Sequence, residues 1–254
     1  MKSHIAILIL NWNGANLLKE CLESVLKVNY SDYSVFVIDN HSKDNSIKLV
    51  ENNFAEVKII SLDRNYGYAA GYNKCFRRLD DKKIDYVLLL NNDTIVDPNI
   101  LTSLNNAKEK YGSNNIYGGK IFYYNNPNRI WFAGGKIRWF LFKIFHVGIR
   151  KMDSEKYSIP MITDYITGCC LFTSLNVIQK LDGFDEKFNM YAEDVDLCLR
   201  ARSMNIFSYY WPDAKLWHHV SASIGGELSL RKFFKKNTSI FKLYKKHILN
   251  KKSY

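Results

Sequence analysis

One stretch of the chain, residues 87–94, limits the choice of fold more than any other. It reads Val-Leu-Leu-Leu-Asn-Asn-Asp-Thr, so four apolar residues run directly into two amides and a carboxylate. Such an apolar run predicts a strand buried on both faces, as in a parallel sheet. Because ligands of open α/β sheets bind beyond the carboxyl ends of the strands, Asp93 is expected where oxygen ligands could hold a hard cation. Alternatively Asp93 caps the next helix, although Asp97-Pro98 suits a helix start better.

The surrounding sequence alternates between strands and helices. Apolar runs at residues 5–10, 35–38 and 57–60 predict strands, and apolar residues at helical spacing between them predict helices. This alternation predicts an α/β fold with a mostly parallel, doubly wound sheet. Further on, we expect a helix over residues 97–110 and a strand over 116–124 that Gly118-Gly119 breaks.

Three polar clusters follow strands in the first half, at residues 11–13, 39–40 and 91–93. Parallel strands align their carboxyl ends, so these clusters are expected to be neighbours. Asp39 could accept the imide N–H of a pyrimidine, since an ionised carboxylate only accepts hydrogen bonds, or it could cap a helix. A loop over residues 65–73, with two glycines, leads into a helix and could approach a phosphate. It lacks the GxGxxG pattern of a dehydrogenase.

The second half carries three carboxylates within four residues, Glu193, Asp194 and Asp196, at the start of a predicted helix. Helical spacing places Glu193 and Asp196 on one side and Asp194 on another. These groups could supply a general base with a tuned pKa, or they could serve only the helix dipole. Arg200 or Arg202 could pair with Asp196. A later histidine could complete a metal site begun by Asp93, although a His pair is more often an ordinary surface or core feature.

Size and charge restrict the partners. A chain of 254 residues with 47% hydrophobic residues suits one sizeable domain. Its net charge of +11 indicates anionic partners, or a lysine-rich surface without one. The five cysteines form no CxxC pair, which favours neither a disulfide framework nor a zinc site and fits a reducing compartment. We expect neither a secretory signal nor a membrane-spanning helix, and therefore a cytoplasmic protein.

Two segments could contact a membrane from the side. Residues 228–254 predict a basic amphipathic helix, which could lie on a membrane surface or dock on the domain. Residues 139–145 are aromatic with flanking basic residues, and could lie at a lipid interface. For this second segment an ordinary core strand is the preferred interpretation.

Five motifs in order resemble those of glycosyltransferase family 2, and most of all its rhamnosyltransferase-like members. The motifs are Asn11-Trp12-Asn13, Asp39-Asn40-His41-Ser42, Asn65-Tyr66-Gly67, Leu90-Asn91-Asn92-Asp93 and Tyr191-Ala192-Glu193-Asp194-Val195-Asp196, and the match runs from about residue 5 to 223. The resemblance implies the GT-A fold in one domain over residues 1–227, followed by the helix at 228–254. In that fold a Rossmann-like nucleotide-binding half, 1–110, is fused to an acceptor-binding and catalytic half, 111–227, around a mostly parallel central sheet.

The resemblance also implies roles for single residues. Asp194 matches the family's catalytic base, and Glu193 would hold substrate hydroxyls or tune Asp194. Asp93 matches the last residue of the DXD-type metal motif, and His218, with His219 as its rival, matches a late histidine that contacts Mg or Mn. Donor-sugar contacts are implied for Asn91 and Gly168. Nucleotide contacts are implied for Asn11, Asn13, Asp39, Asn65, Gly67, Asn73 and Asn92.

The implied reaction is transfer of a sugar, with inversion, from a nucleotide diphosphate donor to a saccharide acceptor. The resemblance favours dTDP-rhamnose, with a UDP-hexose as the alternative, and a lipid-linked acceptor for a surface polysaccharide. The enzyme would work at the cytoplasmic face of an anionic membrane and would bind no nucleic acid.

Two other protein classes fit less well. A nucleotidyltransferase should carry a Gly-rich, Arg-containing loop after its first strand, which Asn11-Trp12-Asn13-Gly14 lacks. A non-enzymatic basic protein that binds membranes or nucleic acid would explain the charge but not the carboxylates. The sugar-transfer hypothesis requires Asp39, Asp93, Asp194 and His218 to converge at one rim of the sheet.

Overall fold

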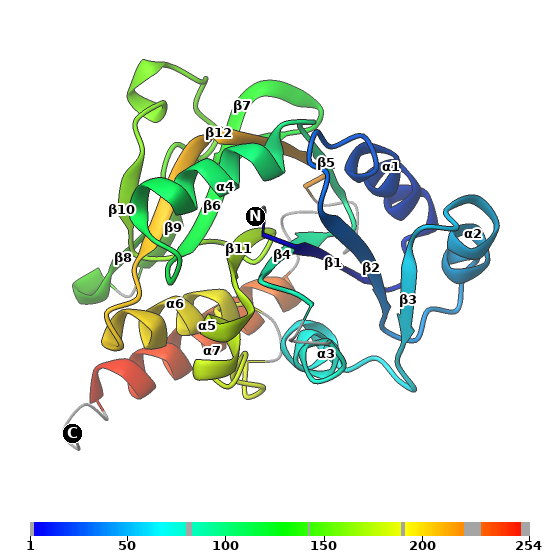
Figure 1. Ribbon diagram of the computed structural model, residues 1–254. Coiled ribbons are helices and arrows are strands. Elements are labelled where there is room, and N and C mark those ends of the chain that lie inside the picture. Colours follow the sequence, from blue (N-terminus) through cyan, green and yellow to red (C-terminus); the bar gives the residue numbers. More distant parts are fainter. Residues whose placement is uncertain (1–2, 80–82, 142, 189–190, 221–229, 250–254) are drawn as a thin grey trace.

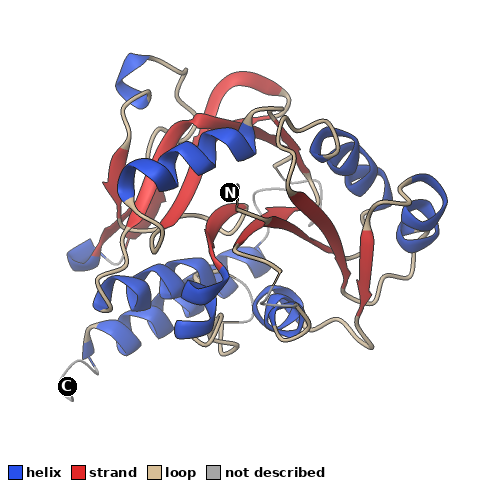
Figure 2. Ribbon diagram, viewed as in Figure 1, coloured by secondary structure: helices blue, strands red, loops and turns tan. Residues whose placement is uncertain are grey.

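A computed structural model describes residues 3–79, 83–141, 143–188, 191–220 and 230–249, with the backbone alone for 230–236. One ten-stranded sheet runs through it in the order β10-β12-β6-β11-β4-β1-β2-β3, with β5 paired to β12 and β7 to β6 (Figure 1). Helices α1 and α4 cover one face, and α3, α5, α6 and α7 lie on the other (Figure 2). This arrangement is a GT-A fold, so the predicted α/β class is confirmed.

The elements have the following bounds. The larger strands are β1 (Ile5–Asn11), β2 (Tyr33–Asp39), β3 (Lys58–Ser61), β4 (Tyr86–Asn91), β6 (Ile116–Tyr123), β7 (Asn126–Phe132), β11 (Cys170–Ser174) and β12 (Ser208–His218). The short strands are β5 (Thr94–Val96), β8 (Gly135–Arg138), β9 (Lys143–His146) and β10 (Met161–Thr163). The helices are α1 (Ala15–Val25), α2 (Ser46–Asn53), α3 (Gly67–Phe76), α4 (Ile100–Tyr111), α5 (Leu175–Lys180), α6 (Glu193–Ser203) and α7 (Leu230–His247), with 3₁₀ turns η1 (Trp139–Leu141) and η2 (Glu155–Tyr157).

The first half of the sheet is parallel and the second half is mixed. Strands β4, β1, β2 and β3 pair in parallel, whereas β11 pairs antiparallel with both β4 and β6. The apolar run at 87–90 lies in β4 and is fully buried, as its composition predicts. Strand β11 thus joins the two halves into one continuous sheet.

The pairing register brings the predicted polar clusters together. Asn11 lies opposite Asp39 across β1 and β2, and Leu10 lies opposite Asn91 across β1 and β4. On the other side, β12 pairs antiparallel with β5, which places His218 opposite Thr94, the residue after Asp93. The carboxyl edge of the first half therefore meets the end of β12.

Several local predictions are wrong. Gly118 and Gly119 do not break strand β6, because a Cβ at Gly119 would lie 2.3 Å from the carbonyl oxygen of Ala214 on β12; glycine permits this close pairing. Helix α3 starts at Gly67, so most of the predicted loop over residues 65–73 is helical. Asp97 is not the helix cap. Its side chain accepts from the N–H of Asn99, which is itself the N-cap, and α4 begins at Ile100.

The aromatic segment at 139–145 is not a core strand. Trp139–Leu141 forms the turn η1, and only residues from Lys143 onward join a strand, β9, in a separate two-stranded sheet with β8. Phe140 is 96% exposed. The segment is therefore divided: Phe140 and Leu141 are exposed, whereas Trp139 and Ile144 are partly buried and pack against the core.

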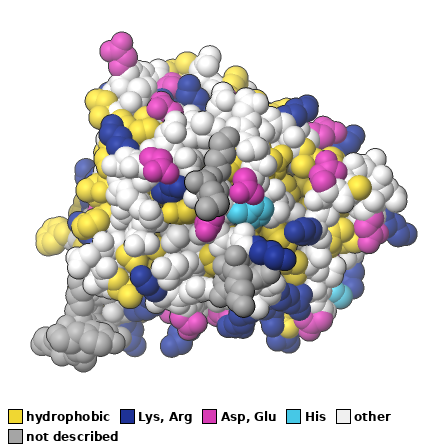
Figure 3. All heavy atoms as spheres, viewed as in Figure 1, with side chains coloured by type: hydrophobic (Ala, Val, Ile, Leu, Met, Phe, Trp, Pro, Cys, Tyr) yellow, Lys and Arg dark blue, Asp and Glu magenta, His cyan; other side chains and the backbone are white. Residues whose placement is uncertain are grey.

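The described surface is mixed in character. On the face drawn in Figure 3, Lys and Arg side chains alternate with Asp and Glu, and apolar side chains lie between them. All five cysteines are buried thiols. Among the described helices, none combines the length and the apolar character that crossing a bilayer requires.

Candidate active site

The ends of β1, β2 and β4 are joined by side-chain hydrogen bonds. The amide of Asn92 donates to Oδ1 of Asn11 at 2.7 Å, and Nδ2 of Asn11 approaches Oγ of Ser42 at 3.2 Å. The same hydroxyl accepts from the N–H of Asn13 at 3.0 Å. Asp39 is buried, and its two carboxylate oxygens lie 3.1 and 3.4 Å from the N–H of Ser42. Three residues for which nucleotide contacts are implied thus contact one serine, and a fourth, Asn92, joins them through Asn11.

The segment before α3 is ordered by amides. Oδ1 of Asn65 accepts from the N–H of Gly67 at 2.8 Å, and Asn40 bonds both the N–H of Tyr66 and the carbonyl of Gly67. Gly67 has a φ of 76°, a conformation that favours glycine. These contacts hold Asn65 and Gly67 beside the end of β2.

Asn73 lies apart from this cluster. Its side chain is buried in α3, donates to the carbonyl of Phe184 and to Glu186, and accepts from the N–H of Phe184. Its hydrogen-bonding groups are used within the chain, and they tie α3 to the turn that precedes α6. The amide of Asn73 therefore has a structural explanation that needs no nucleotide.

Asp93 and His218 form a buried pair. Oδ1 of Asp93 lies 3.1 Å from Nε2 of His218, and both side chains are nearly inaccessible to solvent. Oδ1 of Asp93 and Nδ1 of His218 have no hydrogen-bond partner among the described residues. A carboxylate oxygen and an imidazole nitrogen directed at one another can share a divalent cation. His219, the rival ligand, instead stacks on Tyr124 and lies 3.3 Å from Glu20.

The described residues contain no group of three or more His, Cys, Asp or Glu side chains that could hold a metal ion. The pair supplies only two protein ligands. A cation there would need its remaining ligands from substrate oxygens or water, as is common for Mg²⁺ at phosphate sites.

Glu193 and Asp194 begin helix α6. Oδ2 of Asp194 accepts from the N–H of Gly168 at 2.9 Å, and Oδ1 accepts from the N–H of Val195 at 2.8 Å. Burial raises the pKa of Asp194 despite these bonds. Burial, and then the charge of Asp194, raises the pKa of Glu193, whose Oε2 is buried without a partner among the described residues. Acids with raised pKa values are stronger proton acceptors once ionised.

A short chain of contacts connects Asp194 with Asp93. Gly168 donates to Asp194, and the carbonyl of the next residue, Cys169, accepts from the N–H of Asn91. Burial raises the pKa of the Cys169 thiol well above its usual range, and the charges of Asp93 and Asp194 raise it further. One side chain therefore senses both carboxylates. Asn92 then links this region to Asn11 and, through Ser42, to Asp39.

Two features of the site escaped the sequence reasoning. The hydroxyl of Tyr68 donates to the carbonyl of Gly168 at 2.7 Å. A Cβ at Gly168 would lie 2.3 Å from the hydroxyl oxygen of Tyr68. Gly168 is thus required by Tyr68, and nothing local could predict a contact between residues 100 positions apart. Tyr191 and Ala192, just before Glu193, have φ values of 70° and 72°, which are strained for non-glycine residues.

The chain is similar in sequence to several known proteins. The chain is 22% identical over 247 residues to an N-acetylglucosaminyl-diphospho-decaprenol L-rhamnosyltransferase of Mycobacterium tuberculosis, covering 89% of the chain and 79% of that protein. It is 26% identical over 231 residues to the rhamnosyltransferase WbbL of Escherichia coli K12, covering 85% of the chain and 83% of that protein. It spans only 25% of a further relative, an uncharacterized protein of Sinorhizobium fredii.

A solved structure and a family model complete the comparison. The fold matches a crystal structure of GalNAc-T7 with UDP, GalNAc and Mn²⁺ with a TM-score of 0.71 and 15% identity, covering 85% of this chain and 44% of that one. The model of glycosyl transferase family 2 matches residues 6–175, more than half of the 254 residues. The chain therefore belongs to glycosyl transferase family 2.

Proposed function

We propose that the protein transfers a sugar from a nucleotide diphosphate donor to a saccharide acceptor with inversion at the anomeric carbon. The observation that carries this proposal is the connection of Asp194, through Gly168 and Cys169, to the strand end that bears Asp93. A proton acceptor and a diphosphate-binding pair within one connected site are the two components that such a transfer needs.

Asp93 and His218 fit a divalent cation, Mn²⁺ or Mg²⁺. Their facing atoms are buried, 3.1 Å apart, and Oδ1 of Asp93 lacks a hydrogen-bond partner among the described residues. When bound there, the cation would stabilise the negative charge that develops on the departing diphosphate. Asn91 and Asn92, at the same strand end, would contact the donor through their amides.

Asp194 would act as the general base. Its carboxylate is held by the N–H groups of Gly168 and Val195, and burial raises its pKa. The acceptor hydroxyl would lose its proton to Asp194 while its oxygen bonds to the anomeric carbon. The bond from that carbon to the diphosphate would break on the opposite face, so the configuration inverts. Glu193 would bind a substrate hydroxyl through its unpartnered Oε2.

The two rhamnosyltransferases to which the chain is similar favour a rhamnose donor and a lipid-linked acceptor. Both named relatives are rhamnosyltransferases, and one acts on a diphospho-decaprenol, a polyprenyl lipid. We infer dTDP-rhamnose as the donor and a lipid-linked saccharide, made into surface polysaccharide, as the acceptor. A UDP-hexose is the second candidate, because the GalNAc-T7 structure contains UDP. Asp39 would suit both nucleotides, since thymine and uracil present the same imide N–H.

Calorimetric titration tests the donor and the cation together. We expect saturable binding of dTDP-rhamnose in the presence of Mn²⁺, and loss of the Mn²⁺-dependent part in Asp93→Ala, because one of the two protein ligands is removed. His219→Ala is the matched control, because the His219 side chain contacts Glu20 and Tyr124, and its only contact with Asp93 is through the backbone N–H, which alanine retains. Unchanged titration of the donor by Asp93→Ala with Mn²⁺ present would rule out this role, and a preference for UDP-hexoses would select the second donor.

A lipid-linked acceptor calls for contact with the cytoplasmic face of a membrane. The surface around η1 is suited to it, since Phe140 is 96% exposed and Arg138 and Lys143 are exposed beside it. The ring of Trp139 lies 6.4 Å from that of Tyr244 on α7, which also exposes Phe241. Flotation with anionic phosphatidylglycerol vesicles should exceed that with neutral vesicles and should weaken in Phe140→Ser; equal flotation in all three cases would contradict this contact.

A further inference from the structure

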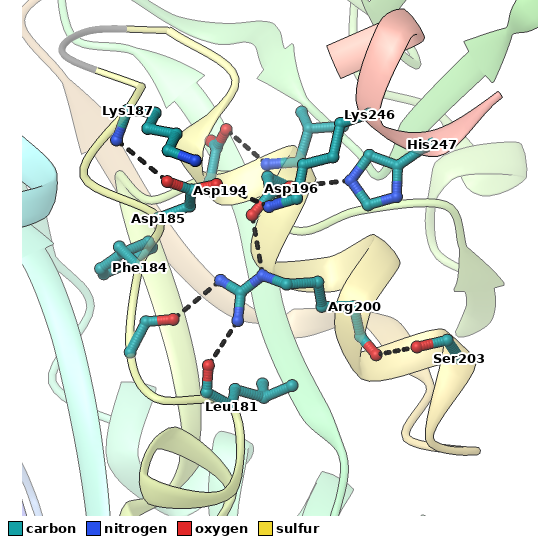
Figure 4. Close-up of polar contacts among 12 residues, drawn as sticks. Leu181, Phe184, Asp185, Lys187, Asp194, Asp196, Arg200, Ser203, Lys246 and His247 are labelled. Atoms are coloured by element: carbon teal, nitrogen blue, oxygen red, sulfur yellow. Dashed lines mark hydrogen bonds and ion pairs between the residues drawn. The ribbon is translucent and has the colours of Figure 1, made fainter. Parts of the chain in front are cut away.

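Asp196 lies on α6 two residues after Asp194 and is fully buried. Two cationic side chains, Arg200 and Lys246, and the imidazole of His247 converge on it (Figure 4). Oδ2 accepts from Nε of Arg200 at 2.8 Å, and Oδ1 lies 2.7 Å from both Nζ of Lys246 and Nε2 of His247. Bonds to His247, Lys246 and Arg200 outweigh the burial of this carboxyl and hold its pKa at about 2.

The same cations reach the segment that leads into α6. Arg200 donates to the carbonyls of Leu181 and Gly183 at 2.5 and 2.7 Å, and Lys246 lies 2.7 Å from Oδ2 of Asp185 (Figure 4). Lys242 donates to the carbonyl of Lys187 at 3.3 Å. Helix α7 is therefore bonded both to α6 and to the chain that precedes it.

The backbone at the start of α6 is strained and has no side-chain cap. Its N-cap, Ala192, cannot bond with its side chain, and both Tyr191 and Ala192 hold strained positive φ values. Strained conformations persist only where the surrounding structure fixes them. Asp196 lies about 3 Å along the helix axis from Asp194, since a helix rises about 1.5 Å per residue. A contact that fixes Asp196 therefore fixes the height and rotation of Asp194.

We propose that Lys246 and His247 are positioning residues, which hold the base Asp194 in place through Asp196. This inference rests on the proposed function of Asp194. Its consequence is selective. The α7 hydrogen bonds and ion pairs described above reach α6 and the segment before it, whereas Asp39 and Asp93 lie at strand ends of the sheet. Donor binding should therefore not depend on the contacts of Lys246 and His247 with Asp196, here called the clamp. Loss of the clamp should lower kcat and leave the KM for the donor unchanged. A displacement of about 1 Å in a catalytic group can cost up to about 100-fold in rate.

Lys246→Met tests the proposal, with Lys245→Met as the matched control. Lys245 is the exposed neighbour on the same helix, so both variants lose one positive charge. We expect at least a ~10-fold fall in kcat for Lys246→Met with a donor KM within about twofold of wild type, and no fall for Lys245→Met. Lys246→Arg, which keeps the cation, should recover most of the loss. An unchanged kcat in Lys246→Met, or an equal fall in the control, would overturn the proposal.

A second measurement does not require activity. Hydrogen exchange of peptides covering residues 193–200 should be faster in Lys246→Met than in Lys245→Met, because α6 loses a fixed contact. If the wild type transfers no sugar, the proposed function fails, yet exchange still decides whether α7 holds α6. If Lys246→Met does not fold, His247→Asn replaces it in both measurements. Equal exchange in the variant and its control would contradict the clamp.

Discussion

Helix α6 carries buried acids on two sides, and their pKa values are shifted in opposite directions. Where α6 meets Gly168, burial raises the pKa values of Asp194 and of its neighbour Glu193. The hydrogen bonds to Asp194 come from the N–H groups of Gly168 and Val195 and from the side chain of Thr167, none of which is a cation. On the side that meets α7, hydrogen bonds from His247 and from the cations Lys246 and Arg200 lower the pKa of Asp196 to about 2. Burial opposes ionisation on both sides, so the number of cationic partners decides the outcome.

This comparison separates a reactive carboxylate from a structural one. A buried acid that is fully paired contributes to the fold and resists protonation, whereas a buried acid without a cation is costly to ionise. Such unpaired acids concentrate at functional sites, where a proton must be exchanged. Spacing in the sequence could not make this distinction, because all three acids lie within four residues.

Asp196→Asn should destabilise the contact between α6 and α7. Removal of the charge leaves Arg200, Lys246 and His247 around a neutral side chain, and breaking a buried ion pair typically costs about 3–5 kcal/mol. We expect a fall of that size in the free energy of unfolding, measured by urea denaturation at pH 7. Asp213→Asn, an exposed acid on β12, is the control and should change stability by less than about 0.5 kcal/mol. A loss below about 1 kcal/mol for Asp196→Asn would show that the contacts of Asp196 with Arg200, Lys246 and His247 contribute little to stability.

Glu193→Gln should change how the free energy of unfolding depends on pH. The folded-state pKa of Glu193 is raised, so the folded protein binds more protons than the unfolded chain above the ordinary glutamate pKa of about 4. Stability contributed by the protonated form is therefore lost as pH rises toward 8. The wild type should lose on the order of 1 kcal/mol or more relative to Glu193→Gln between pH 4 and pH 8. Parallel stability curves for the two proteins would contradict a raised pKa.

Asp196 has the opposite dependence. Its pKa is lowered, so the stability it contributes is present above the ordinary aspartate pKa of about 4 and is lost as pH falls toward 2. The difference in unfolding free energy between wild type and Asp196→Asn should therefore shrink only below about pH 4. The two sides of α6 then respond to pH in separate windows.

The first half of the molecule was predictable because its signals are local. Each of β1, β2 and β4 is an apolar run followed at once by polar residues, and parallel pairing then aligns Asn11, Asp39 and Asn91. This pattern predicts the α/β class, and the resemblance implies the GT-A fold. Of the two arginines that could pair with Asp196, Arg200 does so, whereas Arg202 lies 3.5 Å from Asp164.

The remaining features depend on contacts between distant residues. Asn73 meets a turn 111 residues away, and Tyr68 fixes Gly168 from 100 residues away. The exposure of Phe140 could not be read from an aromatic composition that suits a core strand equally well. The partners of Asp196 on α7 lie about fifty residues beyond it, so its sequence neighbours indicate only Arg200.

Asp194 is the proposed general base, and the donor is proposed to bind at the neighbouring strand ends. The most direct test measures donor binding and sugar transfer side by side in Asp194→Asn, with Mn²⁺, dTDP-rhamnose and a lipid-linked acceptor. We predict wild-type affinity for the donor and a kcat lowered at least ~100-fold, because only proton removal is lost. Turnover close to that of the wild type would contradict the assignment of Asp194 and, with it, the account of the site.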